Sequence, residues 1–500
     1  MDTTVLDGLM LGLQTAATPS NLLYCFSGVL LGTLIGVLPG LGPTATIAML
    51  LPAEEPGSAL IMLAGIYYGA QYGGSTTAIL INLPGEASSV VTAIDGYQMA
   101  RQGRAGAALM TAALGSFFAG TVATLLIAFF APPLAEVALT FSPAEYFSLM
   151  VVGLVASVVL AHGSLLKAIA MIVLGLLLGL IGADTETGIL RFTFDLLDLS
   201  GGISFVIVAM GMFGIGEIVR NLEDERERAV LESKISSLIP SREDLKRIIA
   251  PIFRGTALGS ALGILPGGGA MLSSFASYAL EKKVSATPER FGKGAIEGVA
   301  APESANNAGA QTSFIPMLTL GIPSNPVMAL MIGAMIIQGI QPGPSVVNDQ
   351  PTLFWGIIAS MWIGNLFLVI LNLPLIGIWV RLLTVPYHLL FPMILVFCAI
   401  GVLSINNSSF DVYLIAAFGV FGYVLTKLEC EPAPLLLGFV LGPMMEENLR
   451  RALVLAKGDV TVFVTRPISG VMLLFAALAL IAVLLPIVRT KREEVFQEKD

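Results

Sequence analysis

Charged residues are scarce in this sequence, and their scarcity excludes a soluble fold. Asp, Glu, Lys and Arg make up 12% of the 500 residues, about half the fraction found in a typical soluble domain. The mean hydropathy is +0.85, which is also outside the soluble range. The net charge of −9 is spread over loops and tail, and we expect no nucleic-acid partner.

Cysteines and histidines are also few, and they are too scattered for most catalytic or metal sites. The three cysteines, Cys25, Cys398 and Cys430, form no CxxC pair, so neither a disulfide framework nor a thiolate metal site is expected. The two histidines, His162 and His388, cannot form a histidine metal site by themselves. No HExxH, GxSxG or Walker-type glycine loop occurs, so we expect neither an enzyme nor a cofactor.

Long apolar runs are what the chain has instead. They recur at lengths of about 18 to 25 residues, each enough to cross a hydrocarbon core about 30 Å thick. Examples are residues 105–131, 164–183 and 470–488. The sequence therefore predicts an all-α polytopic membrane protein. No basic segment precedes the first apolar run, so a standard cleaved signal peptide is not expected.

Two glycine–proline breaks interrupt this apolar sequence. GVLLGTLIGVLPGLG at 28–42 aligns without gaps to GTALGSALGILPGGG at 255–269, with eight identities in fifteen positions. Packing of small residues between helices explains the GxxxG spacing, but it does not explain the shared PGxG. We therefore interpret the two segments as corresponding parts of a duplicated half.

The distribution of Lys and Arg predicts that the two halves have opposite orientations. No Lys or Arg occurs before Arg101, whereas the segment after the second break is basic, with Lys282, Lys283, Arg290 and Lys293. Cytoplasmic loops carry the excess of these residues, so the breaks are expected to open to opposite sides. An odd number of apolar spans between the breaks predicts the same inversion. These five spans are 60–83, 105–131, 144–161, 164–183 and 202–219.

Each break is predicted to be a glycine-tipped re-entrant hairpin, and a single broken crossing is the alternative. The apolar arms beside the second tip have roughly 11 or 12 residues, about 17 Å of helix, which is half a bilayer. The predicted architecture is two inverted-topology repeats with a linker and a tail on the cytoplasmic side. The first membrane repeat is 1–219, the linker 220–254, the second repeat 255–488 and the tail 489–500.

The interrupted helices predict a function in transport. Irregular backbone at membrane depth survives only where protein or water satisfies its amides, and inverted repeats of this kind are typical of secondary transporters. Amides at half-helix N-termini favour an anion, although the tips could also be packing devices. The candidate substrate-binding residues are Pro39, Gly40, Leu41, Gly42, Thr44, Pro266, Gly267, Gly268, Gly269, Asn306 and Asn307.

A polar cluster follows each break inside apolar sequence. Intramembrane amides and ionisable groups are costly and indicate function by default, and hydroxyls and carbonyls suit Na⁺. We expect Glu303 either to carry a coupling proton or ligate a cation, or to cap a helix that begins near Ser304. The ligands of a Na⁺ ion are not defined by the sequence. The coupling-ion candidates are Ser75, Thr76, Thr77, Asn82, Glu303, Gln311 and Thr312.

Three segments resemble one known family over nearly the whole chain. GTLIGVLPGLGPTATIAMLLP, YGGSTTAILINLPGEASSVVTAIDGYQMARQGRAGAAL and KGAIEGVAAPESANNAGAQTSFIPMLTLGIPSNPVMALMIGA are similar to the large membrane subunit of the tripartite tricarboxylate transporters, the TctA type. The resemblance implies a multi-pass transporter of the bacterial inner membrane, with a small four-helix membrane subunit and a periplasmic solute-binding protein as partners. It also implies import of citrate and related di- or tricarboxylates with Na⁺ or H⁺. The PGxG signatures of the family map onto Pro39, Gly40 and Gly42, and onto Pro266, Gly267 and Gly269.

Two alternatives to a citrate importer remain open at this point. Family members serve different carboxylates, so the substrate could instead be another acid, for example an aromatic one. A passive anion channel is the other alternative, although rings of like charge or a repeated filter should mark a channel and the sequence shows neither.

Overall fold

The architecture is almost entirely helical, which confirms the predicted all-α class. A computed structural model describes residues 5–38, 46–47, 56–82, 85–160, 164–184, 187–223, 240–265, 269–382, 391–392, 395–396, 398–400, 402–403 and 408–484. Within this part the strands are β1 (Gly182–Ala183) and β2 (Leu190–Arg191), which pair as a short antiparallel hairpin.

Four of the described helices are long and apolar enough to cross a membrane by length and composition. They are α2 (Pro19–Val37), α6 (Ala105–Ala138), α17 (Pro351–Asn372) and α20 (Ser409–Lys427). Shorter apolar helices are α1 (Val5–Ala16), α7 (Pro143–Leu160), α8 (Leu165–Gly179), α15 (Pro326–Ile337) and α23 (Pro467–Leu484). Several of them expose large apolar side chains, such as Leu166 and Phe475, as expected of a surface solvated by lipid.

The remaining helical elements complete the described chain. They are α4 (Pro56–Ile81), η1 (Ala87–Ser89), α5 (Val90–Arg101), η2 (Leu197–Leu199), α9 (Phe205–Ala209), the π-helix η3 (Met210–Ile215), α10 (Gly216–Glu223), α11 (Arg242–Gly263), α12 (Gly269–Val284), η4 (Pro288–Arg290), α13 (Glu297–Thr312), α14 (Phe314–Leu320), α16 (Val346–Asp349), α18 (Ile376–Leu382), α21 (Pro432–Leu455) and α22 (Val462–Thr465). The five spans predicted between the breaks all fall on helices. The helix α5 was not predicted, because its sequence VVTAIDGYQMAR mixes apolar and polar residues without a long apolar run.

Helix α11 begins inside the segment predicted as a linker. Ser241 and Asp244 form a capping box at its N-terminus, in which Ser241 Oγ accepts from the Asp244 amide and the Asp244 carboxylate accepts from the Ser241 amide. Such reciprocal bonds satisfy the amides that a helix N-terminus leaves free. Residues 224–239 of the predicted linker and the predicted tail 489–500 lie outside the described residues.

A glycine at every fourth position brings α2 into backbone contact with α4. A Cβ at Gly28 would lie 2.3 Å from the Met62 carbonyl oxygen, and a Cβ at Gly36 would lie 2.3 Å from the Ala70 carbonyl oxygen. Only glycine permits this approach. Because the paired residue numbers rise together along both helices, α2 and α4 run in the same direction.

The second motif packs in the same way. A Cβ at Gly255 would lie 2.3 Å from the Ala301 carbonyl oxygen, and one at Gly263 would lie 2.4 Å from the Gly309 carbonyl oxygen. Helices α11 and α13 therefore also run in the same direction. The α13 residues that these glycines contact, Ala301 and Gly309, each lie 239 positions after the corresponding α4 residues, Met62 and Ala70. The correspondence between the two segments therefore extends from each motif helix to the helix against which it packs.

Helix α12 packs against both α11 and α13. At one end a Cβ on Gly309 would lie 3.2 Å from the Gly269 carbonyl oxygen, and at the other end a Cβ on Gly298 would lie 3.1 Å from the Tyr278 ring. Helix α12 is thus antiparallel to α13 and hence to α11, against which it also packs. The pair α11 and α12 flanks residues 266–268. Whether the pair enters and leaves the membrane on one side stays a prediction.

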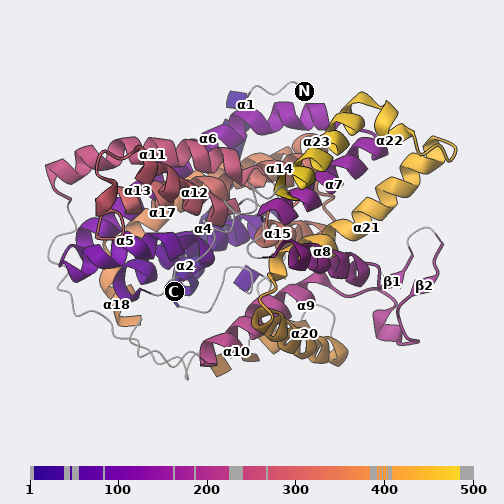
Figure 1. Cartoon of the computed structure of the whole chain (residues 1–500), viewed down its shortest axis with the longest axis horizontal. Coiled ribbons are helices and arrows are strands. Elements are labelled where there is room, and N and C mark those ends of the chain that lie inside the picture. Colours follow the sequence, from indigo (N-terminus) through magenta and orange to yellow (C-terminus); the bar gives the residue numbers. More distant parts are fainter. Residues whose placement is uncertain are drawn as a thin grey trace.

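Helices α4 and α13 are buried along almost their whole length. Every residue of α4 from Ser58 to Ile81 is buried, and so is every residue of α13 from Gly298 to Thr312. Figure 1 shows α2, α5, α11, α12 and α13 gathered in one half of the molecule and α7, α8, α21 and α23 in the other. A helix covered on all sides can present polar groups only to other protein groups.

Candidate functional site

Helices α4 and α13 cross in opposite directions, and the contacts between them define the candidate site. The Tyr67 ring on α4 lies 6.5 Å from the ring of Phe314, which begins α14 two residues after the end of α13, and farther along α4 the Ser75 hydroxyl lies 2.5 Å from Glu303 Oε2 on α13. Residue numbers rise along α4 while they fall along α13. The antiparallel crossing therefore places the polar cluster of one predicted repeat directly against that of the other.

Glu303 is the centre of this crossing. Its side chain is completely buried, with 0% exposure. Ser75 on α4 and Thr92 on α5 each place a hydroxyl against one of its two carboxyl oxygens. Because α13 begins at Glu297, Glu303 lies within the helix, and the alternative that it caps a helix beginning near Ser304 is wrong.

Asn307 extends the polar group by one turn. Its Nδ2 donates to Ser116 Oγ on α6 at 2.6 Å and to the backbone carbonyl of Glu303 at 3.1 Å. The candidate site thus joins α4, α5, α6 and α13 through hydroxyl, amide and carboxyl groups. We call Ser75, Thr92, Ser116, Glu303 and Asn307 the hydroxyl cluster.

A second polar group lies beside the hydroxyl cluster, at the loop that follows α4. The Ser88 hydroxyl contacts the Glu86 carboxylate and lies 2.9 Å from Gln71 Oε1. The Glu86 carboxylate interacts electrostatically with Glu303 and lies beside Asn306. Asn306 has 0% exposure, and both polar atoms of its amide lack a hydrogen-bond partner among the described residues. A buried amide left this way is costly, so it indicates a site that another group completes.

Asn325 joins the end of the second break to α4. Its Nδ2 donates to the Tyr67 hydroxyl at 3.3 Å and to Ser313 Oγ at 3.2 Å, while its Oδ1 caps α15. Gly269, with φ +54°, opens α12 beside it, because a Cβ there would lie 3.4 Å from Asn325 Cβ. Asn325 and Tyr67 were not predicted.

The predicted substrate-binding residues divide into those that can be placed and those that cannot. Gly269, Asn306 and Asn307 are described, and all three lie within the region around the crossing. The rest fall outside the described residues: Pro39, Gly40, Leu41, Gly42, Thr44, Pro266, Gly267 and Gly268.

The predicted coupling-ion residues do not all meet. Ser75 and Glu303 are brought together, but Gln311 accepts from Thr124 on α6 instead. Thr77 and Thr312 donate to carbonyls of their own helices, at Gly74 and Ala308 respectively. Asn82 has φ +56°, ends α4 and is exposed. Thr76 lines the cavity described next.

A small cavity adjoins the hydroxyl cluster. Its volume is about 10 Å³, and its lining is Tyr72, Ser75, Thr76, Leu109, Ala112, Ala113, Ser116 and Asn372. That volume is close to the minimum for one water molecule. The cavity therefore suits a water or a proton path and does not admit a tricarboxylate.

The residues that sequence reasoning missed around Glu303 are Glu86, Ser88, Thr92 and Ser116. Glu86, Ser88 and Thr92 lie in the segment LPGEASSVVTAI, in which no long apolar run or repeat to the second half stands out. The structure shows a correspondence between this segment and the second half of the chain. Asn82 and Gly321 are again 239 positions apart, and both end their helices with positive φ, 56° and 68°. At the same spacing Glu86 corresponds to Asn325.

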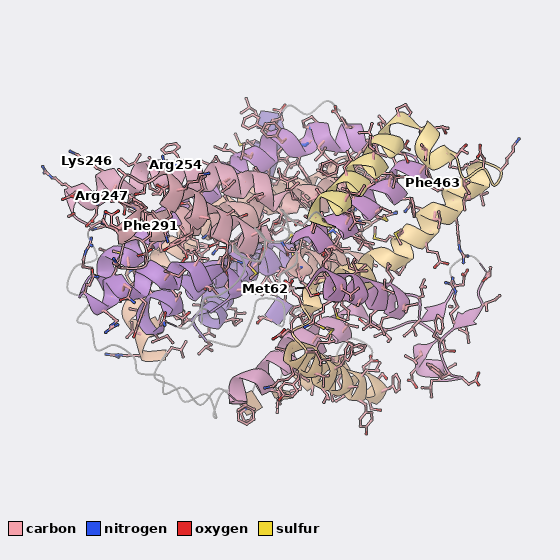
Figure 2. The ribbon with its side chains drawn as sticks, in the orientation of Figure 1. Met62, Lys246, Arg247, Arg254, Phe291 and Phe463 are labelled. Atoms are coloured by element: carbon pink, nitrogen blue, oxygen red, sulfur yellow. The ribbon has the colours of Figure 1, made fainter. Side chains whose placement is uncertain are left out.

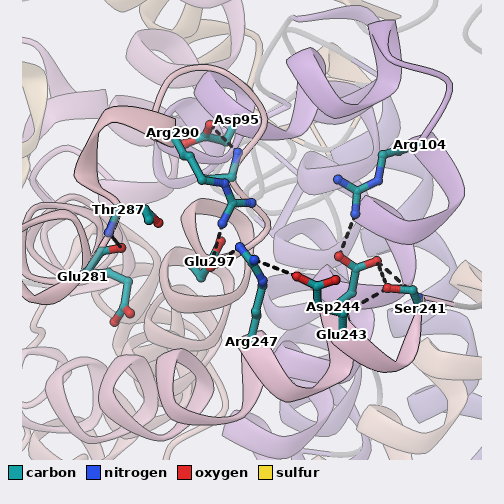
Figure 3. Close-up of polar contacts among 12 residues, drawn as sticks. Asp95, Arg104, Ser241, Glu243, Asp244, Arg247, Glu281, Thr287, Arg290 and Glu297 are labelled. Carbon is teal, nitrogen blue, oxygen red and sulfur yellow. Dashed lines mark hydrogen bonds and ion pairs between the residues drawn. The ribbon is translucent and has the colours of Figure 1, made fainter.

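Ion pairs occupy the other end of α13. Glu297 lies 3.2 Å from Arg290 and 3.6 Å from Arg247. We call the group formed by Asp95, Arg104, Asp244, Arg247, Arg254, Glu281, Arg290 and Glu297 the charged belt, and Figure 3 shows most of its contacts. Figure 2 shows Arg247 near one end of α11, beside Lys246, and Arg254 farther along the same helix.

Asp244 illustrates how the charged belt favours ionised groups. Burial alone would raise the pKa of Asp244, but hydrogen bonds from Ser241 and from Arg104, at 2.7 Å, together with the Arg104 charge, hold this pKa below its ordinary value of 3.8. By contrast, the described part of the chain contains no group of three or more His, Cys, Asp and Glu side chains placed to hold a metal ion.

These features define the class of protein first. A helical membrane protein with buried polar groups where helices cross is typical of a membrane transporter. The particular family follows from the sequence comparison: the model of the tripartite tricarboxylate transporter TctA family matches residues 22–437. The chain belongs to this family, which is a family of transporter components.

Two curated relatives come from Agrobacterium vitis. The chain is 64% identical, over 499 residues and 99% of both chains, to an uncharacterized 52.8 kDa protein in the TAR-I ttuC' 3' region. It is 65% identical over 242 residues, 48% of this chain and 100% of the relative, to an uncharacterized protein in the TAR-II ttuC' 3' region. No solved structure matches the chain.

Proposed function

We propose that the chain is the large membrane subunit of a secondary active importer of citrate-like di- or tricarboxylates, coupled to Na⁺ or H⁺. Its proposed place is the bacterial inner membrane, and its proposed partners are a small four-helix membrane subunit and a periplasmic solute-binding protein. Membership of the TctA family carries this proposal. The buried hydroxyl cluster supports ion coupling, because ionisable groups inside a membrane protein are costly unless they have a function.

The transport mechanism that we propose uses two inverted repeats. Helix α2 runs with α4, helix α11 runs with α13, and α4 crosses α13 in the opposite direction. The Tyr67–Phe314 and Ser75–Glu303 contacts bracket Ala70 and Gly309, which are equivalent positions of the two units. A two-fold axis near this crossing would exchange the units. Secondary transporters alternate access by moving such units against each other.

The proposed substrate site lies at the glycine breaks. Gly269 begins the 16-residue helix α12, so the positive end of its dipole faces the second break. The polar groups described beside this end are Asn325 and Ser313. Amides and a helix N-terminus suit a carboxylate without requiring an arginine.

Uptake of labelled citrate into proteoliposomes tests the proposed function. The vesicles would hold this chain and its small membrane partner, with the binding protein added or omitted, under an imposed Na⁺ or pH gradient. We expect accumulation above equilibrium only with the binding protein and one of the gradients. Equilibration that ignores both gradients would favour the passive channel. Accumulation of another carboxylate but not citrate would change the substrate and keep the mechanism.

A further inference from the structure

The hydrogen-bond partners of Ser75 outnumber its protons. Ser75 Oγ lies 3.0 Å from the backbone carbonyl oxygen of Gln71 and 2.5 Å from Glu303 Oε2. A hydroxyl carries one proton, so it can donate fully to only one of these two acceptors. If Ser75 donates to Gln71, the contact with Glu303 needs a proton on the carboxyl group.

A neutral Glu303 satisfies every group in this chain of contacts. Ser75 Oγ contacts Glu303 Oε2 and the Gln71 carbonyl, and Thr92 donates to Glu303 Oε1; in the acid form Oε2–H would donate to Ser75, which would leave the Ser75 proton for Gln71. A protonated carboxyl has one donor and one remaining acceptor oxygen. The arrangement thus matches the acid form atom for atom.

The ionisable groups around Glu303 also favour its neutral, protonated form. A buried carboxylate without a cation costs several kcal/mol, and the titratable groups that face Glu303 are Tyr72 from α4 and Glu86 from the loop before α5. Neither can be positive, and the Tyr72 hydroxyl already donates to Asn365 at 2.7 Å. Helices α5 and α6 face it with the hydroxyls of Thr92 and Ser116.

The charged groups on the other packed elements have partners elsewhere. Asp95 on α5 accepts from the Tyr278 hydroxyl and from backbone amides of the segment before α13. Arg254 on α11 pairs with Glu281 on α12 at 2.6 Å. Arg247 and Arg290 pair with Glu297, the first residue of α13. Helix α14 carries no charged residue, so no described cation neutralises Glu303.

We propose that Glu303 carries the coupling proton and that it is a carboxylic acid in the state described here. This inference rests on the proposed transport function, and it chooses H⁺ over Na⁺. Both carboxyl oxygens are in direct hydrogen-bond contact with hydroxyls, which occupy lone pairs that a bound cation would otherwise use.

The proton has a route to and from Glu303. On release the Oε2–H bond breaks as its proton passes to Ser75 Oγ, and the hydroxyl's own proton passes to a water molecule in the cavity that Ser75 lines, so that a carboxylate, a neutral hydroxyl and a hydrated proton result. Ser75 and Ser116 line that cavity. Glu86, which is only partly buried, and the Asn306 amide beside it also lie close to Glu303. Because Ser75 and Thr92 belong to one unit and Glu303 to the other, release of the proton changes the contact between the units.

Infrared difference spectroscopy on the full chain in lipid nanodiscs tests the proton directly. Raising the pH from neutral should remove the C=O band of a protonated carboxylic acid. Glu303→Gln should lack this band, and Ser75→Ala should shift it because its hydrogen bond is lost. Glu281→Gln is the matched control, since Glu281 is a buried glutamate already paired with Arg254, and it should keep the band.

The opposite spectra would overturn the proposal. If the wild type shows no acid band that depends on Glu303, the group is ionised. If adding Na⁺ at constant pH instead perturbs a carboxylate band that requires Glu303, the coupling ion at this site is sodium.

Transport then separates this inference from the proposed function. In proteoliposomes with the full tripartite system, Glu303→Gln should lose citrate accumulation driven by a pH gradient and keep exchange of internal for external citrate. A wild type that takes up no carboxylate would contradict the proposed function, and the infrared result would still decide the state of Glu303. Accumulation at the wild-type level in Glu303→Gln would overturn the proton assignment alone.

Discussion

Helix α13 carries two glutamates six residues apart, the half-buried Glu297 and the fully buried Glu303, and their surroundings differ. Glu297 lies between Arg247 and Arg290 in the charged belt, whereas Glu303 meets the hydroxyls of Ser75 and Thr92. The distance along the helix is about 9 Å. Burial, together with Glu281 and Asp95, raises the pKa of Glu297, and the Arg247 charge offsets part of this effect, whereas no cation faces Glu303 among the described residues. A carboxyl group among hydroxyls can change its charge, which is what a coupling residue must do.

The charged belt and the hydroxyl cluster also differ in their exposure to solvent. The arginines of the charged belt are partly exposed, with 37% of the Arg254 side chain and 36% of the Arg104 side chain accessible, so their charged ends reach solvent as long cationic side chains commonly do. The side chains of the hydroxyl cluster are all buried and do not reach solvent. Charge is therefore confined to one end of α11 and α13, and the centre of the crossing is left to groups that hydrogen-bond without a fixed charge.

The largest expected effect comes from moving α13 as a whole, since this would disrupt both regions at once. In Gly259→Ala the new Cβ would lie 2.2 Å from the Ala305 carbonyl oxygen, which only separation of α11 and α13 can relieve. We expect a loss of about 3 kcal/mol or more of stability, at or above the upper end for overpacked sites. Thermal unfolding of the purified protein, followed by circular dichroism, measures it.

Gly57→Ala is the control for this prediction. Gly57 is also helical, at the start of α4, but a Cβ there would meet nothing within 4 Å among the described residues, so alanine should be neutral or slightly stabilising. Equal unfolding temperatures for the two alanine variants would show that α13 is not held in register by the glycine contacts.

Substitution of one side chain in each region should have unequal effects on the free energy of unfolding. Arg254→Ala leaves the Glu281 carboxylate buried without its cation, and we expect a loss of about 1–2 kcal/mol, reduced from the value for a fully buried pair because Arg254 is partly exposed. Glu303→Gln replaces a neutral acid by a neutral amide of the same shape and should change the unfolding temperature much less. A larger loss in Glu303→Gln than in Arg254→Ala would contradict the contrast between the two regions.

The hydrogen bonds of the hydroxyl cluster should have a smaller effect on stability. Thr92→Val removes the donor to Glu303 Oε1 and keeps the side-chain shape, at a cost of about 1 kcal/mol. Thr111→Val on α6 is the matched control, because the Thr111 hydroxyl is buried and has no partner among the described residues. It should be neutral or stabilising. Equal losses of unfolding free energy in the two variants would show that the Thr92 bond contributes nothing specific.

The sequence predicts the helical class, which the structure confirms, because apolar runs are a local pattern. The duplication of a half stays a prediction. Apolar runs fix where helices form, and the motif GxxxGxxxGxxPGxG fixes which helices touch through their glycines. Glu303 and Ser75 were also candidates, because polar residues inside apolar runs are conspicuous. Their meeting was not predictable, since it depends on how α4 crosses α13, a relation between residues 228 positions apart.

The errors in the prediction have a similar origin. Thr312, Thr77 and Ser75 appeared equivalent in sequence, and all three hydroxyls contact a carbonyl of their own helix, as hydroxyls often do inside a helix; only Ser75 also contacts Glu303. Glu303 appeared able to cap a helix that begins near Ser304, yet α13 begins at Glu297 and contains Glu303. Thr92 was missed because α5 has no long apolar run. Tertiary packing decides each of these cases, and a single sequence does not contain it.

The smallest predicted loss of stability is in the charged belt, and it should depend on pH. The pKa of Asp244 is lowered below 3.8, so its ionised form stabilises the folded state above that value, and this contribution is lost as the pH falls through the folded-state pKa. We expect Asp244→Asn to cost less than about 1 kcal/mol at neutral pH, since Arg104 is partly exposed and salt screens the pair. The difference in unfolding temperature from wild type should shrink on acidification and in high salt. A difference that is independent of pH would mean that Asp244 acts only as a helix cap, through bonds that asparagine can also form, and that the charged belt is not held together by charge at this position.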